Sequence, residues 1–459
     1  MSGLPPAFSY YVNSLGAGVE RNSVRIVPDN GENASNNSSI TFTLPTDSVI
    51  DLNSLQFTGK FELTNAVDAS ANVAMPQAHS LFRSVQWALN GNVVCGNSNQ
   101  SFGQVYEALR RATTDEQDAT SRMSEYANVP IADSNGKFQA SLGFPAGTAA
   151  NTGKYIQFND FMGLQRCPNA GAWDTAIFGQ TRLHLYLESD RINLYGSGTD
   201  ITQNTAWRLT GVEMRVDVLR IPPAIDDIIA SRLASGSSLD TVFPEIYAQV
   251  SSADANVRCS IASNSLDMLG FMPLRSDYGS ATRVAADDAT LAIAAASSPY
   301  GAHFNRFNMR TTGGANVAIG NETVKYNWVL NGRTIPASGK VRVEQGLEYT
   351  KDCFSKGVGE HNQLYRGLLA NDGSTLQRAS SYLRENALLN NTVVCHKLCL
   401  TAPAHETAER SLTGMNTQGA SATIQLQTEN FYGSDYVLIF GQTSAVLSAM
   451  AGQQVSVQY

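Results

Sequence analysis

Apolar and polar residues alternate along much of this 459-residue chain, in short segments separated by turn residues. A period of two is typical of a strand that buries one face. Short strands at regular spacing, each bounded by turns, favour a β-sandwich or a β-barrel. Strands are predicted at 24–26, 40–44, 55–63, 183–187, 212–218, 242–250, 257–262, 341–343, 394–400, 424–426, 436–440 and 455–457, with the clearest alternation at 183–187 and 212–218.

One strand-and-turn pattern occurs twice. The string WALNGNVV spans residues 87–94, and WVLNGRTI spans residues 328–335. Both copies alternate up to an Asn-Gly pair, which tolerates positive φ at both central positions of a type I′ turn. The sequence therefore predicts two hairpins of the same design, far apart in the chain.

Each predicted hairpin sets a tryptophan against a β-branched residue. A two-residue turn places Trp87 opposite Val94 in the first copy and Trp328 opposite Ile335 in the second. Pro336 lacks a backbone donor, so the second hairpin is expected to end there or to run along an edge of the sheet. An indole ring could stack a sugar or a base, but a place inside an alternating strand favours packing in a core.

A second repeated string follows each hairpin. QVYEAL at 104–109 and QLYRGL at 363–368 share the pattern Gln-x-Tyr-x-x-Leu. Around the first string, apolar residues recur at helical spacing, and Ser101 begins a capping box. We expect a pair of helices over 101–126 and a matching pair over 363–389. Two features in the same order indicate a duplicated unit.

The chain is expected to divide into two units of similar size. The segment IPPAIDDIIASRLASGSS (221–238) breaks the strand pattern: its prolines end a strand, its paired aspartates begin a short helix and Gly236 ends that helix. The N-terminal residues are apolar without periodicity, and we expect them to become ordered only against a neighbour. The expected divisions are an N-terminal arm (1–22), a first jelly roll (23–221), a linker with a short helix (222–238) and a second jelly roll (239–459).

Composition fits a globular protein without a dominant charged face. Hydrophobic residues make up 42% of the chain and charged residues 16%, and the formal net charge is −8. A nucleic-acid-binding face needs a basic patch, so we expect no direct, sequence-specific binding of nucleic acid. The N-terminus lacks the charged and apolar segments of a secretory signal. No apolar run is long enough to span a membrane.

Free, mostly buried thiols in a reducing compartment are expected, because six cysteines are scattered without the spacing of a disulfide framework. Cys395, His396 and Cys399 raise the question of a metal site. On a strand, Cys395 and Cys399 face one side and His396 faces the other, so one ion is not expected to bind all three. The sequence predicts no metal site. The cysteines are Cys95, Cys167, Cys259, Cys353, Cys395 and Cys399.

No catalytic or cofactor-binding motif is present: the Walker, GxGxxG, HExxH and GxSxG patterns are all missing from the sequence. Several histidines are dispersed without a neighbouring nucleophile, and two acidic pairs fit helix starts or solvated loops better than a catalytic couple. We expect no catalytic site, no cofactor and no enzymatic activity. The residues considered are His79, His184, His303, His361, His405, Asp226 with Asp227, and Asp287 with Asp288.

The segment HSLFRSVQWALNGNVVCGNSNQSFGQVYEALRRA (79–112) resembles double jelly-roll major capsid proteins of polinton-like viruses, virophages, adintoviruses and related eukaryotic double-stranded DNA viruses. In those proteins a Ser-Leu-Phe segment leads into a strand with Leu-Asn-Gly, and a Tyr-centred helix follows. The resemblance is specific over 79–126 and architectural elsewhere. It implies an all-β fold of two tandem jelly-roll β-sandwiches, each with a helical excursion after its Trp-x-Leu-Asn-Gly hairpin.

The same resemblance implies a function. It leads us to expect a major capsid protein that forms pseudo-hexameric homotrimeric capsomers in an icosahedral shell. The implied partners are further copies of the chain, neighbouring capsomers, and penton and minor or cement capsid proteins; an inner membrane stays an open question. Such a protein is found in the virion, is made in the cytoplasm or nucleus of the host cell and is not secreted.

Other functions stay open at the level of sequence. A minor capsid, penton or spike protein is the first alternative. A tandem β-sandwich carbohydrate-binding protein is less favoured, because such a protein normally shows a secretion signal and disulfides or calcium-type acidic clusters. A carbohydrate-active enzyme would need paired carboxylates on a rigid sheet, which the sequence does not suggest.

Overall fold

The computed structural model describes part of the chain. The described residues are 20–66, 72–74, 78–96, 103, 105, 130–132, 138–140, 143–144, 147–189, 194–196, 206–220, 231, 233–252, 254–274, 325–342, 345–346, 349–350, 352–353, 393–400, 412–419, 423–429 and 436–459. Within these ranges, no helix is long and apolar enough to cross a membrane.

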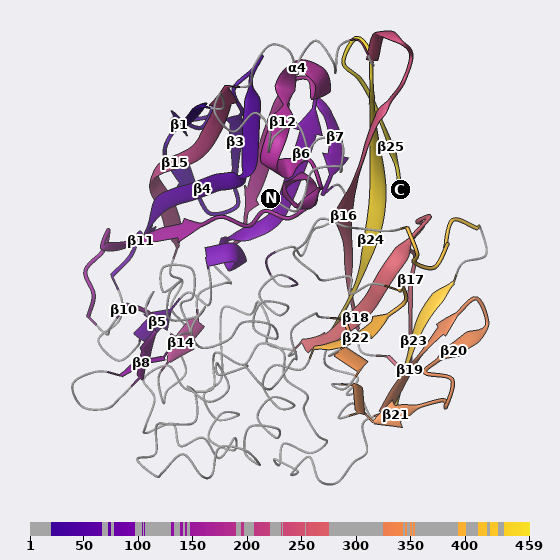
Figure 1. Ribbon diagram of the computed structural model, residues 1–459. Helices are drawn as coiled ribbons and strands as arrows, with labels where there is room; N and C mark the ends of the chain where they lie inside the picture. The colour runs from indigo at the N-terminus through magenta and orange to yellow at the C-terminus, as the bar shows by residue number, and fades with distance from the viewer. Residues whose placement is uncertain are drawn as a thin grey trace.

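The first half of the chain forms two antiparallel sheets (Figure 1). Its principal strands are β1 (Glu20–Ile26), β3 (Ser39–Thr43), β4 (Val49–Leu63), β6 (Phe82–Leu89), β7 (Asn92–Cys95), β11 (Gly153–Phe158), β13 (Thr181–Leu187) and β15 (Trp207–Arg220). One sheet has the order β1-β15-β4-β11, and the other has the order β3-β13-β6-β7. Two short strands extend the first sheet, β2 (Ala34–Ser35) beside β15 and β12 (Trp173–Asp174) beside β4.

The second half repeats this arrangement. Its principal strands are β16 (Leu239–Ser252), β17 (Asn256–Cys259), β18 (Leu266–Leu274), β19 (Lys325–Leu330), β20 (Arg333–Ile335), β22 (Val394–Lys397), β23 (Ile424–Glu429) and β24 (Tyr436–Met450). The sheet orders are β16-β24-β18-β22 and β17-β23-β19-β20. Two further strands are β21 (Val341–Arg342), which pairs with β19, and β25 (Gln454–Gln458), which pairs with β24.

Both halves are wound in the same order. When the eight principal strands of each half are numbered along the chain, the two sheets read 1-8-3-6 and 2-7-4-5 in both halves. This is the arrangement of a jelly roll, in which two Greek keys close two sheets over one core. The expected fold of two tandem jelly rolls is therefore confirmed. We call the sandwich of β1 to β15 roll 1 and the sandwich of β16 to β25 roll 2.

Short elements fill the connections of roll 1. Between β11 and β13, η2, η3 and α4 lie on the side of roll 1 that meets roll 2, since η2 contacts β16 and α4 contacts β24. Two small sheets, β10-β5-β14 and β8-β9, lie outside the two principal sheets of roll 1 (Figure 1), and Phe144 of β10 packs against Phe61 of β4. The bounds are η1 (Ala78–Leu81), η2 (Gly163–Arg166), η3 (Ala170–Ala172), α4 (Thr175–Phe178), β5 (Asn72–Ala74), β8 (Pro130–Ala132), β9 (Phe138–Ala140), β10 (Gly143–Phe144) and β14 (Leu194–Gly196).

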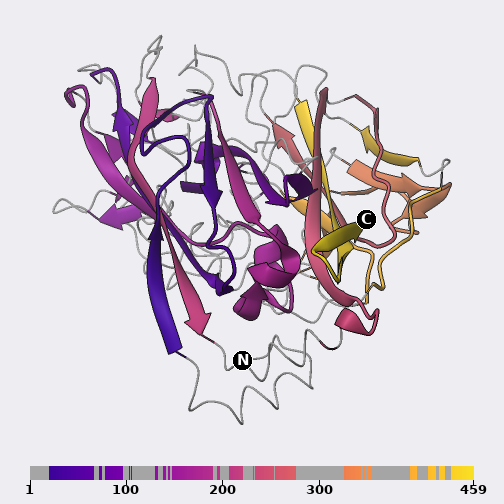
Figure 2. The same cartoon turned by 90° about the horizontal axis from the view of Figure 1, so that it is seen from above.

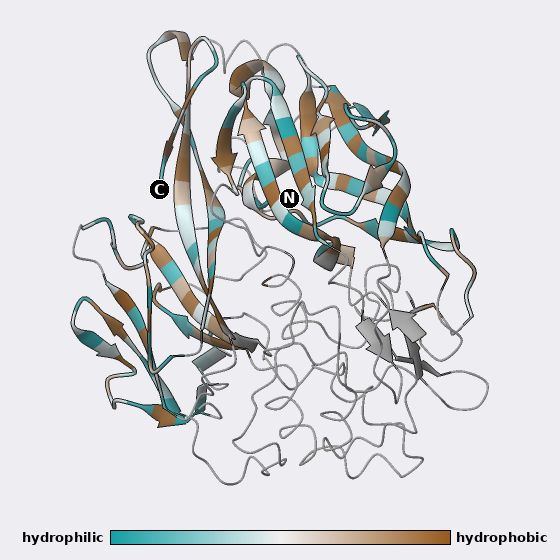
Figure 3. Cartoon of the chain, turned by 180° about the vertical axis from the view of Figure 1, so that it is seen from behind, coloured by the Kyte–Doolittle hydropathy of each residue, from teal (hydrophilic) through white to brown (hydrophobic). Residues whose placement is uncertain are grey.

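The alternation in the sequence becomes the inner and outer faces of the sheets. On β13, Thr181, Leu183, Leu185 and Leu187 are buried, and the residues between them are only half-buried. β23 follows the same pattern. Figure 3 shows it as alternating brown and teal bands along strands of both rolls. Because burying one leucine side chain contributes about 1.5–3 kcal/mol, these positions decide which face of each strand points inward.

Both predicted Asn-Gly turns form. Asn90 and Gly91 have φ angles of 51° and 83°, and Asn331 and Gly332 have φ angles of 49° and 77°. These left-handed values are those of a type I′ turn, which explains why Asn-Gly stands at both places.

The register of the two hairpins differs by one residue. Trp328 pairs with Ile335, as predicted, and β20 ends before Pro336. Trp87 pairs with Cys95 instead of Val94, so the predicted partner is wrong. A bulge interrupts the register next to Trp87 and leaves the valine as the additional residue of β7.

Two strands of roll 2 differ from the prediction. β18 was not expected, because Leu266 to Met272 are all buried and show no alternation. It lies inside its sheet, between β24 and β22, and both faces are covered. β24 runs from Tyr436 to Met450, well past the predicted end at Phe440.

The predicted helix pairs fall largely outside the described residues. Of 101–126, only Gly103 and Val105 are described, and both are helical. None of 363–389 is described. The linker helix is described at its C-terminal end, where Gly236 has a φ of 83° and its amide donates to the Leu233 carbonyl.

Candidate functional site

The residues considered for a metal site lie in different surroundings. Nε2 of His396, on β22, is 2.7 Å from the hydroxyl of Tyr326, and burial lowers the pKa of His396 to about 4. Cys395 points to the opposite side of β22 and belongs to the buried hydrophobic cluster that includes Leu438 and Phe440. β22 ends at Lys397, so Cys399 lies beyond the strand and the alternation argument does not apply to it. Among the described residues, no group of three or more His, Cys, Asp or Glu side chains could hold a metal ion.

All six cysteines are free and buried, as the sequence predicts. Burial raises the pKa of Cys167 to about 11 and that of Cys259 to about 12. Burial also raises the pKa of Cys95, and the nearby carboxylate of Glu245 adds to this effect. Because the thiolate is the reactive form, these three side chains are poor nucleophiles at neutral pH.

The two described histidines among the catalytic candidates serve packing and hydrogen bonding. Nδ1 of His184 is 3.0 Å from the hydroxyl of Thr41, and burial lowers the pKa of His184. His79 is buried, with its ring centroid 4.9 Å from that of Phe158. The remaining candidates lie outside the described residues: His303, His361, His405, Asp226, Asp227, Asp287 and Asp288.

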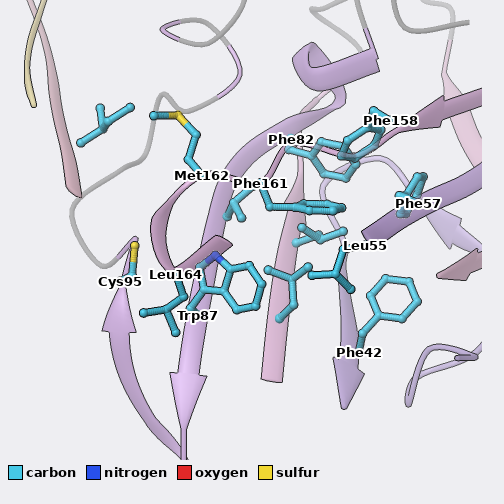
Figure 4. Packing of buried hydrophobic residues seen from close by; sticks show 14 of the residues in the cluster. Phe42, Leu55, Phe57, Phe82, Trp87, Cys95, Phe158, Phe161, Met162 and Leu164 are labelled. Carbon is cyan, nitrogen blue, oxygen red and sulfur yellow. The ribbon is translucent and has the colours of Figure 1, made fainter. Parts of the chain in front are cut away.

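Both repeated tryptophans are fully buried, so neither ring is available to stack on a ligand. Figure 4 shows Trp87 next to Cys95 and Leu164 inside roll 1. Gly163 approaches so closely that a Cβ there would lie 2.9 Å from the indole Cδ1 and 2.5 Å from the cysteine sulfur. With a φ of 59°, this position also needs glycine for its backbone. Core packing, the favoured interpretation of these rings, is confirmed.

One contact between the rolls joins the end of β7 to β16 and to Tyr459, which follows β25. The backbone amide of Gly96 donates to both carboxyl oxygens of Glu245, at 2.9 and 3.1 Å. The hydroxyl of Tyr459 donates to the Val94 carbonyl at 3.1 Å. We call these four residues, together with Pro244, the inter-roll contact.

The hairpin tips of the two rolls are tied together beside this contact. Nδ2 of Asn90 donates to the Gln453 carbonyl at 3.1 Å, and the Gln453 side-chain amide donates to the Ala176 carbonyl at 3.1 Å. The Asn90 side-chain oxygen accepts from the amide of Gln180. The first Asn-Gly turn therefore anchors the β24–β25 hairpin onto roll 1.

Apolar packing makes the two rolls one unit. Phe243, Ala445 and Leu447 of roll 2 belong to the same buried cluster as Leu89 and Val94 of roll 1. Figure 1 shows the upper parts of β16, β24 and β25 beside β7, and Figure 2 shows the two sandwiches side by side. A second cluster, around Trp328, fills the interior of roll 2 alone.

Glu245 is the acidic side chain of the inter-roll contact. It is 1% exposed, and burial raises its pKa to about 7, although the Gly96 amide and the Cys95 thiol oppose this effect. The sequence analysis missed this residue. The sequence feature that could have pointed to it is a single acidic residue inside the apolar run VFPEIY (242–247), because a buried carboxyl has to be paired or neutral.

The first strand of roll 1, β1, forms an exposed sheet edge, whereas the first strand of roll 2, β16, is covered by the inter-roll contact. On β1, six of the seven residues are exposed. Arg21 forms ion pairs with Asp51 and Asp217, and Arg25 forms one with Glu213. These bonds fix the arginines along the strand, but exposed ion pairs contribute only about 0–1 kcal/mol each. The edge of β1 is thus a well-ordered surface without a covering element among the described residues.

No family model matches the chain, and no curated protein matches it in sequence. Its structure is similar to solved capsid structures. The PBCV-1 virus capsid matches with a TM-score of 0.56 and 10% identity, over 96% of this chain and 97% of that chain. The Faustovirus major capsid protein matches with a TM-score of 0.53 and 10% identity, over 94% and 90%.

The structure of the Sputnik virophage matches with a TM-score of 0.50 and 12% identity, over 96% and 88%. The chain has the double jelly-roll fold. The matched length covers both rolls, so the likeness extends to their pairing within one chain. Identities of 10–12% show the fold alone, and the side chains of this double jelly roll have to be interpreted from its own contacts.

Proposed function

We propose that this double jelly-roll chain is a major capsid protein, and that three copies form a pseudo-hexameric capsomer of an icosahedral shell. The observation that carries the proposal is the presence of two rolls with the same strand order, held together by a buried contact. Its fold, shared with viral capsid structures over almost the whole chain, supports the same function.

Symmetry explains why a trimer suits this chain. Closed homo-oligomers repeat one contact around an axis. Three copies of a chain with two similar rolls give six sandwiches around that axis, and a capsomer of roughly hexagonal outline can tile a shell. Jelly rolls suit this role because their closed sheets leave short edges and loops for contacts.

The proposal includes partners and location. Neighbouring capsomers, and penton and minor or cement proteins, are the expected partners, and the protein functions in the virion after synthesis in the cytoplasm or nucleus of the host cell. The net charge of −8 disfavours direct packaging of the genome by this chain. We retain 23–221 and 239–459 as the proposed bounds of the rolls, and we propose a structural role without enzymatic activity.

Light scattering on the purified protein tests the proposal directly. A trimer has a mass of about 148 kDa, three times the 49.3 kDa of one chain. Electron microscopy of the same sample should show particles with a hexagonal outline. A stable monomer under assembly conditions would contradict the proposal, and five-fold rings would favour a penton protein.

A further inference from the structure

The inter-roll contact uses two defined edges. Roll 1 contributes the end of its fifth strand, where Gly96 follows β7. Roll 2 contributes its first strand, where Glu245 lies on β16. Each roll has both edges, so each chain carries a second copy of each: the fifth strand of roll 2 (β20) and the first strand of roll 1 (β1). We call these two the free edges, because among the described residues no further strand pairs with them.

Strand pairing identifies the residues of roll 2 that correspond to Cys95 and Gly96. In roll 1 a row of paired residues crosses one sheet, and the equivalent row in roll 2 passes through the second tryptophan. The rows are Cys95–Trp87–Leu183–Phe42 and Ile335–Trp328–Leu426–Val257. Ile335 therefore corresponds to Cys95, and the next residue, Pro336, corresponds to Gly96.

A second pair of rows identifies the residue of roll 1 that corresponds to Glu245. In each roll, one row of inward-facing positions crosses all four strands near the C-terminal end of the sixth strand. The rows are Ile26–Met214–Phe57–Phe158 and Tyr247–Gly441–Leu269–His396. Glu245 stands two residues before its row and Val24 stands two residues before the other, so these two residues correspond.

The two free edges match each other chemically. In the inter-roll contact, an amide donor at Gly96 meets a carboxyl acceptor at Glu245. At the corresponding positions, Pro336 has no amide hydrogen and the side chain of Val24 has no acceptor, so the backbone donor and the side-chain acceptor are lost together. What replaces them is apolar: Val24 is 37% exposed and Val27, just beyond β1, is 44% exposed.

Exposed valines on an open edge strand are costly for a protein that stays alone, because such an edge invites pairing with another chain. A proline opposite them fills space without leaving a donor unpaired. Two apolar surfaces facing each other would remove from water the area that both now expose. The substitutions at both edges therefore fit one contact between copies.

We propose that Ile335 and Pro336 of one copy dock against β1 around Val24 of a second copy, repeating the inter-roll contact between chains. This inference rests on the proposed function, since the second copy is the next member of the trimer. Each chain then supplies one contact within itself and one to its neighbour. Repeated three times, the two alternate around a closed ring of six rolls.

Cysteine cross-linking tests this pairing. Ala337, next to Pro336, is exposed, so the double variant Val24→Cys/Ala337→Cys places two thiols on the two edges. After mild oxidation we expect covalent trimers on a non-reducing gel. The native cysteines are buried and do not compete.

The matched control is Tyr155→Cys/Ala337→Cys. Tyr155 is 79% exposed on β11, at the opposite edge of the same sheet as β1, and this pair should stay uncross-linked. A trimer by light scattering that gives no cross-link from the Val24 variant, or an equal cross-link from the control, would overturn the pairing and leave the capsid proposal standing. A monomeric parent protein would instead overturn the capsid proposal, and this pairing with it.

Exchanging the chemistry of the two contacts gives a second test. At pH 8, Val24→Glu should raise the concentration at which half of the trimer dissociates at least ten-fold, because its carboxylate would face Pro336 without a donor. Adding Pro336→Gly supplies an amide and recreates the Glu245–Gly96 pair. The double variant should then form trimers more tightly than the product of the two single effects predicts. If the dissociation concentration of the double variant equals the product of the two single effects, the correspondence between the two contacts is wrong.

Discussion

Replacing Glu245 with glutamine should stabilise the protein at pH 8 and leave its stability unchanged at pH 4. Glutamine keeps an acceptor for the Gly96 amide but cannot ionise. The wild-type carboxyl has an ordinary pKa of 4.5 when unfolded and a pKa of about 7 when folded, raised by burial. The nearby titratable groups, Cys95 and Tyr459, also have pKa values raised by burial and stay neutral over this range.

The stability of the folded protein falls with rising pH, because the carboxyl of Glu245 ionises at a lower pH in the unfolded state than in the folded state. Below pH 4.5 the carboxyl of Glu245 is protonated in both states, and its full contribution to stability is present. Between pH 4.5 and about 7 the unfolded state ionises while the folded state does not, so stability falls as the pH rises. Above pH 7 both states are ionised, and the loss is complete.

The magnitude is about 3 kcal/mol, because each pH unit between the two pKa values corresponds to about 1.4 kcal/mol. If the whole chain unfolds as one unit, its unfolding entropy is about 1 kcal/mol per degree, and the glutamine variant melts about 3 °C above wild type at pH 8. Denaturant unfolding followed by tryptophan fluorescence, at several values between pH 4 and 8.5, measures the same difference directly.

Glu62→Gln is the control, because its sign is opposite. Lys60 donates to the Glu62 carboxylate at 2.7 Å and lowers the pKa of Glu62, with Arg208 contributing at 3.0 Å. This variant should be less stable than wild type at neutral pH and equal to it in acid. If the free energy of unfolding of Glu245→Gln differs from that of wild type by the same amount at pH 4 and pH 8, the pKa of Glu245 is not raised in the folded protein.

Three further predictions concern folding and assembly. Trp328→Ala should destabilise roll 2 by about 3–5 kcal/mol, because the indole is fully buried; calorimetry that shows less than about 1 kcal/mol would contradict the packing. Gly96→Ala should displace the end of β7 and weaken the hydrogen bonds between residue 96 and Glu245, because its Cβ would lie 1.9 Å from the Val85 carbonyl oxygen of roll 1 at a φ of 87°; the expected result is greater sensitivity to proteolysis, and unchanged digestion would count against it. Removing residues 1–19, which leaves β1 complete, should permit folding, by circular dichroism, but abolish assembled particles; normal particles in the electron microscope would show that the arm does not lock neighbours.

Sequence pattern predicted the strands that bury one face but missed β18, which buries two. β13 and β23 alternate because one side faces the core and the other faces solvent. β18 lies between β24 and β22 with both faces covered, so its apolar run carries no period. Gly270 and Pro273 within it argue locally against a strand. Its burial is set by strands that come more than a hundred residues later, which a local window does not contain.

The inter-roll contact could not be predicted from the sequence either, because it also depends on residues far apart in the chain. The Asn-Gly turns follow from local backbone preference and could be placed to the residue, but the bulge beside Trp87 shifts its partner to Cys95. This shift brings Gly96 to the carboxyl of Glu245 on the other roll. No local rule links position 96 to position 245, so the candidate site required the three-dimensional arrangement.

The long β24 has a consequence for the order of events during synthesis. It pairs along its whole length with β16, about 200 residues earlier, and such non-local pairing is slow. Its residues Ala445 and Leu447 complete the cluster that also buries Leu89 and Val94. A nascent chain therefore carries an uncovered apolar side on roll 1 until β24 leaves the ribosome. During that interval the chain is most prone to aggregation and most dependent on chaperones, and a chain released early would carry this unfinished side away from productive assembly.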